Sequence, residues 1–160
     1  MGTKSEVGVL NRLYRTAKAG EWGFNTVAGV VRNRGLKVLL KTFAQQRRQM
    51  ADELAAEIER LGGDVTERRS FPAMVHRGRV ALVGTMIIKE GRTTRAMLKE
   101  AALGEDAAMR RYRRALDADL SAETRALLND HLRQIEETAA TVTELRSQNG
   151  KRMLVHLFPS

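Results

Sequence analysis

Six polar residues stand on or beside stretches where apolar residues recur at helical spacing. They are Glu21, Gln46, Gln49, Glu105, His131 and Gln134. A carboxylate on an otherwise apolar face is costly to bury unless it is paired or bound to a metal ion, so these residues are where chemistry is expected. Counted from the nearest expected turn, all six fall in the middle third of a helical bundle, where some four-helix bundles hold two metal ions.

The types of these residues argue against a metal centre. A dinuclear carboxylate site takes one Glu from each of two helices and Glu-x-x-His from each of the other two. Here the corresponding positions read Gln46-x-x-Gln49 and His131-x-x-Gln134. Amides are neutral, and two carboxylates with one imidazole leave two divalent ions under-neutralised. We therefore expect no metal and no cofactor, and a polar network with Arg47 as a further partner; a weak mononuclear site is the alternative.

The apolar spacing predicts the helices that position these residues. Repeats at three and four residues predict helices over residues 5–33, 36–62, 93–118 and 121–148. Gly35 is expected to mark the first turn, and Gly62-Gly63 to end the second helix in a left-handed cap. Ser121 is expected to cap the fourth helix.

Connection lengths predict how these helices are arranged. Short turns join the first two and the last two helices, so each pair forms an antiparallel hairpin, while residues 63–92 form a long crossover. The predicted fold is all-α: a ferritin-like up-down four-helix bundle with a crossover between helices 2 and 3. We expect one domain over residues 1–148 and a tail, 149–160, that docks either on its own bundle or on another chain.

Composition excludes several classes of protein. The 160 residues contain no cysteine, which excludes disulfide scaffolds and thiolate metal sites. The longest apolar stretch, Val80–Ile88, is too short to cross a membrane, and no signal peptide opens the chain, so we expect a cytoplasmic protein. The net charge is +9, and a basic surface is expected at Arg110, Arg111, Arg113 and Arg114. Because acidic residues are interspersed, any binding to nucleic acid should be weak and non-specific.

Three stretches resemble motifs of a known family: Lys18–Phe24, Ala44–Gly63 and Gly104–Leu116. The chain is similar, over residues 10–147, to a bacterial family of ferritin-like four-helix-bundle proteins of unknown function. The resemblance implies a fold rather than a reaction. Members usually carry an acid where Ala19 stands, often another near Ala102, and tend to have a histidine where Ala139 stands. Each departure removes a ligand that a metal site would use.

These observations favour a non-enzymatic role. We expect a small bundle that acts through contacts with a protein partner or with itself, around a degenerate and metal-free polar centre. The resemblance to the family implies a place in stress or envelope-associated physiology. A ferritin-like protein that binds iron or manganese is the alternative, and a basic protein associated with nucleic acid is a further one.

Overall fold

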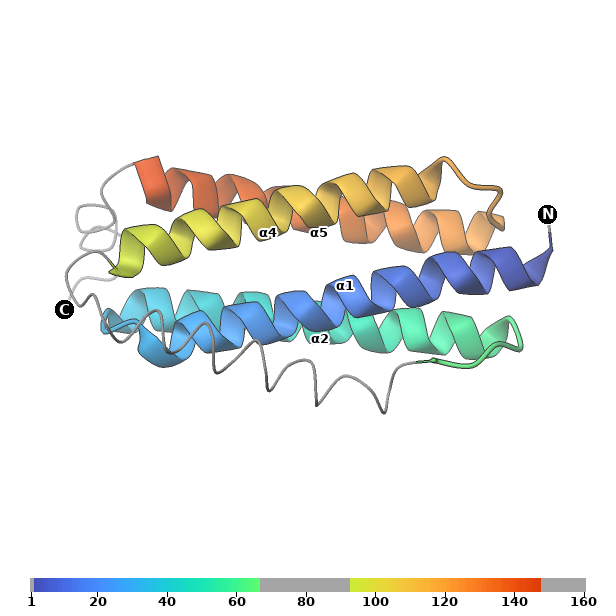
Figure 1. Ribbon diagram of the computed structural model, residues 1–160, viewed down its shortest axis with the longest axis horizontal. Coiled ribbons are helices and arrows are strands. Elements are labelled where there is room, and N and C mark those ends of the chain that lie inside the picture. Colours follow the sequence, from blue (N-terminus) through green and yellow to red (C-terminus); the bar gives the residue numbers. More distant parts are fainter. Residues whose placement is uncertain (1, 67–92, 148–160) are drawn as a thin grey trace.

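A computed structural model describes residues 2–66 and 93–147, and all regular structure in these ranges is helical. The helices are α1 (Thr3–Val30), α2 (Arg34–Arg60), α4 (Thr93–Leu116) and α5 (Ala122–Ser147) (Figure 1). At 1.5 Å per residue they are about 36 to 42 Å long. The four predicted helices are thus confirmed, with differences at their ends. No helix in the described ranges has the length and apolar character needed to cross a membrane.

The four helices form two antiparallel hairpins, as predicted. α1 packs along α2, and α4 packs along α5. Figure 1 shows α1 and α5 running in one direction and α2 and α4 in the other. α1 also contacts α4, and α2 contacts α5, which closes the bundle. The predicted crossover lies outside the described residues from residue 67 onward, and so does the predicted tail, 149–160.

The turn between α1 and α2 differs from the prediction. α1 ends at Val30 rather than at residue 33, because Asn33 adopts an extended backbone and caps the next helix. Its Oδ1 accepts a hydrogen bond from the Leu36 amide at 2.9 Å, which satisfies one of the amide groups left free at a helix start. Gly35, expected to mark the turn, lies inside the first turn of α2.

The other two predicted helix signals are confirmed. Gly62 has a φ of 74°, in the left-handed region that favours glycine, and the Gly63 amide donates to the Ile58 carbonyl at 2.9 Å. Gly63 also lets the chain pass close to α1, since a Cβ there would lie 2.6 Å from a methyl carbon of Val7. At the start of α5, the Thr124 amide donates to Ser121 Oγ at 3.3 Å.

The predicted apolar stripes form a core in two parts. One cluster packs the half of the bundle that holds the start of α1 and the end of α2, including Leu10, Leu54 and Leu128. The other packs the opposite half, including Phe24, Leu40 and Val142. Between the two clusters lie two buried polar side chains, Arg47 of α2 and Glu105 of α4, of which Glu105 is among the six residues singled out by the sequence.

Candidate functional site

A buried ion pair between α2 and α4 lies at the centre of the polar layer. Arg47 Nη2 donates to Glu105 Oε2, and the two side chains are only 2% and 4% exposed. Arg47 Nη1 also donates to Gln46 Oε1 at 2.9 Å and approaches Met50 Sδ at 3.5 Å. Burial raises the pKa of Glu105 above its usual value, against the opposing effect of the Arg47 charge. The pair is therefore held in a poorly solvated position, where removing either partner leaves an uncompensated charge.

Two residues of α1 make room for Arg47. A Cβ at Gly20 would lie 3.1 Å from Arg47 Cγ and 3.2 Å from Cδ, tighter than most contacts of this kind. The Arg47 guanidinium carbon lies 5.8 Å from the centre of the Phe24 ring, within the range of a cation–π contact. A glycine and an aromatic ring on one face of α1 thus accommodate the cation that α2 projects into the bundle.

A second chain of contacts leads from the bundle interior to its surface. His131 Nε2 lies 2.7 Å from Glu53 Oε2, and His131 Nδ1 lies 3.1 Å from the Tyr112 hydroxyl. Because a carboxylate can only accept, neutral His131 carries its hydrogen on Nε2 and accepts from Tyr112 through Nδ1. Burial lowers the pKa of His131, although the Glu53 hydrogen bond opposes this, and burial raises the pKa of Tyr112. His131 is fully buried, whereas the Glu53 side chain is 38% exposed.

The six residues singled out by the sequence are divided among several contacts. Gln46 reaches Glu105 through Arg47 and also accepts from Thr138 Oγ1 at 3.1 Å. Gln49 is exposed and reaches His131 through Glu53, to which it donates at 2.9 Å. The expectation that all six satisfy one another in one network is therefore correct only in part.

Two of the six residues pair locally instead. Glu21 binds Lys18, one turn earlier on α1, and its side chain is 18% exposed. Gln134 donates to Asp130, one turn earlier on α5, at 2.8 Å. A neighbour one turn away on the same helix is always within reach, so it competes with partners across the bundle.

The donor set does not fit a dinuclear metal centre. Glu105 binds the Arg47 guanidinium, Glu21 binds a lysine, and both nitrogens of His131 are engaged. Among the described residues, no three His, Asp or Glu side chains gather closely enough to hold one ion. These side chains therefore form hydrogen bonds and ion pairs with other side chains of the protein.

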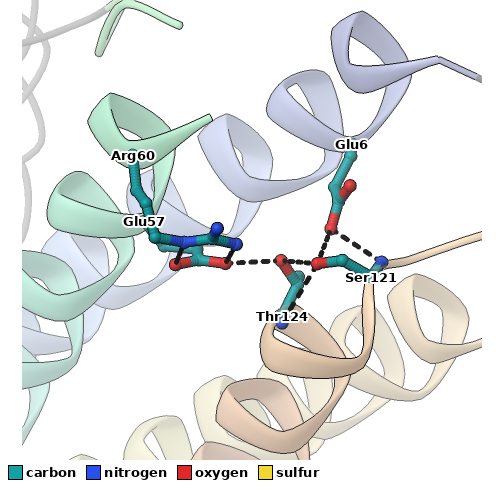
Figure 2. A network of polar contacts seen from close by, with 5 residues as sticks. All are labelled: Glu6, Glu57, Arg60, Ser121 and Thr124. Atoms are coloured by element: carbon teal, nitrogen blue, oxygen red, sulfur yellow. Dashed lines mark hydrogen bonds and ion pairs between the residues drawn. The ribbon is translucent and has the colours of Figure 1, made fainter. Parts of the chain in front are cut away.

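A separate polar cluster joins three helices at one end of the bundle (Figure 2). Glu6 Oε1 accepts from the Ser121 amide at 3.0 Å and from Ser121 Oγ at 2.7 Å. Thr124 Oγ1 donates to Glu57 Oε1 at 2.8 Å, and Arg60 donates to both oxygens of the same carboxylate. Burial pushes the pKa of Glu6 upward, but the hydrogen bonds that its carboxylate accepts from the Ser121 amide and hydroxyl help to hold it below its usual value. The cluster ties α1, α2 and α5 together where α5 begins.

Sequence reasoning missed Glu53, Tyr112 and Glu6 as polar partners. Glu53 follows Gln49 by four residues, a spacing that places the two on one face of α2. Tyr112 stands on an apolar stripe, where its hydroxyl requires a partner once it is buried. These spacings could have pointed to Glu53 and Tyr112, whereas nothing in the sequence links Glu6 to a serine 115 residues away.

The four arginines of the expected basic surface lie on α4 close to an acidic residue of α5. Arg110, Arg111, Arg113 and Arg114 are all exposed on α4. Arg113 donates to Glu136 of α5 at 2.7 Å, in a pair whose side chains are 58% and 45% exposed. Such an exposed pair contributes little to stability and reduces the positive field only locally.

Comparison with known proteins gives one family. Residues 5–118 match the family model described as a domain of unknown function (DUF2383). The matched range spans more than two thirds of the chain and includes Arg47, Glu105 and Tyr112, but not His131. No curated protein matches the chain.

Proposed function

Because the chain belongs to the DUF2383 family, whose description assigns no activity, we propose a function from its geometry: a non-enzymatic, ferritin-like bundle that acts through contacts with another protein or a second copy of itself. Its polar centre has a structural role and holds no metal. The observation that carries this proposal is the buried Arg47–Glu105 pair, which supplies both charges of the polar centre from the chain itself.

The arginine fills the electrostatic role that a metal ion has in related bundles. Its guanidinium stays charged at every physiological pH, so it neutralises Glu105 permanently. A divalent ion bound to the same carboxylate would stand beside a buried positive charge, and their repulsion would be poorly screened. With Glu105 already neutralised and Glu21 turned toward Lys18, a cation would find no carboxylate pair to bridge it.

Two surface features support contacts with a protein. Val30 and Val38, on either side of the α1–α2 turn, are 38% and 56% exposed, and Leu103 on α4 is 50% exposed. Exposed large apolar side chains are among the features of protein interaction sites. The net charge of +9 favours a partner with an acidic surface, because complementary charge speeds encounter.

The metal-free centre is tested by elemental analysis of the full chain purified without chelators and then dialysed against ferrous or manganous ions. We expect far less than one ion per chain. Arg47→Gln is the informative variant because it removes the competing cation while leaving Glu105 in place. Stoichiometric metal in the native chain, lost in Glu105→Gln, would overturn the proposal.

Self-association is tested by sedimentation equilibrium over a wide range of protein concentration. If the exposed valines form the contact, the Val38→Asp variant should be more monomeric than the native chain. The Lys41→Asp variant, changed one turn along the same helix, should differ less from the native chain. A native chain that is monomeric throughout and binds no acidic protein in a direct assay would contradict a contact-based role.

A further inference from the structure

A cavity of about 350 Å³ opens between α1 and α4, directly beside the Arg47–Glu105 pair. Small residues of both helices line its walls: Ala19, Gly20 and Gly23 on α1, and Ala101, Gly104 and Ala107 on α4. Because these side chains are small, they leave an open space between α1 and α4 that larger side chains would fill. The volume is at the lower end of that found for small-molecule sites, and it equals about twelve water molecules at their liquid volume.

The rest of the lining is mainly apolar. Phe24, Met50, Tyr112 and Ile135 contribute from all four helices. The charged residues of the lining are two of each sign: Arg47 and Glu105, which form the buried ion pair, and Glu100 and Arg111 on α4. Charge is therefore balanced around the cavity, and a ligand that brings a charge of its own would gain no net partner and would lose its hydration.

One buried polar atom beside the cavity has no partner. Arg47 Nε is shielded from solvent and makes no hydrogen bond among the described residues, although both terminal nitrogens of the same guanidinium do. A buried donor without an acceptor is rare in folded proteins and costly. Gly20 lines the cavity, and a Cβ there would lie 3.5 Å from Nε, so this donor packs against the glycine at the edge of the cavity.

We propose that the cavity is a binding site for a small, uncharged, mainly apolar molecule whose carbonyl oxygen accepts a hydrogen bond from Arg47 Nε. The apolar lining contacts the body of the molecule. The equal number of positive and negative residues in the lining disfavours charged ligands. The unpaired Arg47 Nε favours a ligand that carries a hydrogen-bond acceptor. Arg47 lines the cavity but its Nε is shielded, so contact takes a side-chain adjustment of the kind that is common on binding. This site goes beyond the proposed protein contacts and does not depend on them.

The glycines of the cavity wall provide matched variants for a test. A Cβ at Gly23 or Gly104 would meet nothing within 4 Å, so a leucine at either position can enter the open space without displacing the core. Gly29 on α1 has equally open surroundings but does not line the cavity. Gly23→Leu and Gly104→Leu should therefore fill the site, whereas Gly29→Leu should leave it free.

The probe is Prodan, an uncharged naphthalene ketone whose emission shifts to the blue in apolar surroundings. We expect the native chain to bind it with a blue shift, Gly23→Leu and Gly104→Leu to weaken binding about tenfold or more, and Gly29→Leu to leave it unchanged. The analogue 2-(dimethylamino)naphthalene, which lacks the ketone, should bind about tenfold more weakly than Prodan. Circular dichroism and the thermal midpoint confirm that each variant is folded.

Each other outcome contradicts the proposal. If the native chain gives no blue shift at saturating Prodan, the cavity does not take this class of molecule. If both cavity-filling variants bind as the native chain does, Prodan binds elsewhere, for example at the exposed valines. If Prodan and the analogue bind equally to the native chain, Arg47 Nε does not select an acceptor.

Discussion

Gly20 of α1 lies directly under the aliphatic stem of Arg47, so that a single added carbon at Gly20 would come within 3.1 Å of it. This relationship explains a glycine in the middle of a long helix, where glycine is normally unfavourable. The glycine allows α1 to approach α2 closely enough for the arginine to extend across the bundle to Glu105 on α4.

Replacing Gly20 by alanine should therefore fail to give the usual gain in helix stability. A Gly→Ala change in a helix interior normally stabilises by about 0.5–1 kcal/mol. Gly23→Ala, with open surroundings three residues away, should show that gain, and Gly20→Ala should fall below it by about 1 kcal/mol because Arg47 must shift. Urea unfolding of the two variants measures the difference; equal gains would show that the contact is unimportant.

The ion pair should be strongly non-additive. Glu105→Leu alone should destabilise by about 3–5 kcal/mol because it leaves the buried Arg47 charge without a partner, and Arg47→Met alone should do the same to Glu105. The double variant should come close to the native stability or exceed it, since two apolar side chains then replace two charges. A double-mutant cycle by chemical denaturation measures the coupling, and additive losses would contradict it.

His131 should make the protein less stable in mild acid. Burial lowers the folded-state pKa of His131 below its unfolded value, so its stabilising contribution is present above about pH 6.5 and is lost as the pH falls through the folded pKa. The groups that face it are Tyr112 from α4, Glu53 and Arg47 from α2, and Asp130 from α5. The free energy of unfolding should fall between about pH 7 and 5, and less so in His131→Gln.

The comparison of the two pH curves isolates the histidine from Glu105. The pKa of Glu105 is raised by burial, so its effect has the opposite sign: acidification favours the folded state, which binds the proton first. Both proteins contain Glu105, and its contribution cancels in the difference. A difference curve that is flat from neutral pH downward would show that His131 does not titrate in this range.

The Ser121 cap at the start of α5 should contribute strongly to the free energy of unfolding. Ser121→Ala removes both the helix cap and the contacts of its hydroxyl with Glu6 and Thr124, and should cost about 1–2 kcal/mol. Ser147→Ala, which removes only an exposed hydroxyl contact at the end of the same helix, should cost much less. Thermal unfolding of both variants provides the measurement; similar losses would place the role of Ser121 outside this cluster.

Binding to nucleic acid should be weak and sensitive to salt. The four exposed arginines of α4 can neutralise phosphates, so some binding is expected at low ionic strength. It should disappear between about 50 and 200 mM salt and show no preference for sequence. Fluorescence anisotropy with duplex and single-stranded oligonucleotides tests this. Tight binding that persists at the higher salt and is lost when Arg110, Arg111, Arg113 and Arg114 become Gln would favour the nucleic-acid alternative.

The helices and core were predictable because apolar spacing alone determines which face of a long helix is buried. Leu10, Phe24, Leu40 and Leu128, which belong to the apolar repeats of the four predicted helices, are buried. The first turn was misplaced because Arg32-Asn33-Arg34-Gly35 offers two signals, and the asparagine cap prevailed over the glycine. The capping bond is formed by the Asn33 side chain, whereas Gly35 adopts an ordinary helical conformation.

The middle position of the polar residues was also predictable, but their partners were only partly so. Depth along a helix follows from counting residues, and it correctly placed Glu105 and His131 in the buried layer. Partner choice depends on the rotation of each helix and on competition within it. Lys18 binds Glu21 because it lies one turn away on the same helix, and Glu53 binds His131 because the rotation of α2 and α5 brings the two side chains together; a one-dimensional pattern contains neither.

The polar layer that separates the two halves of the core also fixes how the hairpins are aligned lengthwise. Two smooth apolar surfaces can slide past each other by one helical turn, about 5.4 Å, and still bury a similar area. Such a slip here would bring Arg47 opposite alanines of α4, with Ala101 and Ala108 one turn on either side of Glu105, and would strand both charges. The buried charges thus select one axial register among several that the apolar side chains alone would tolerate.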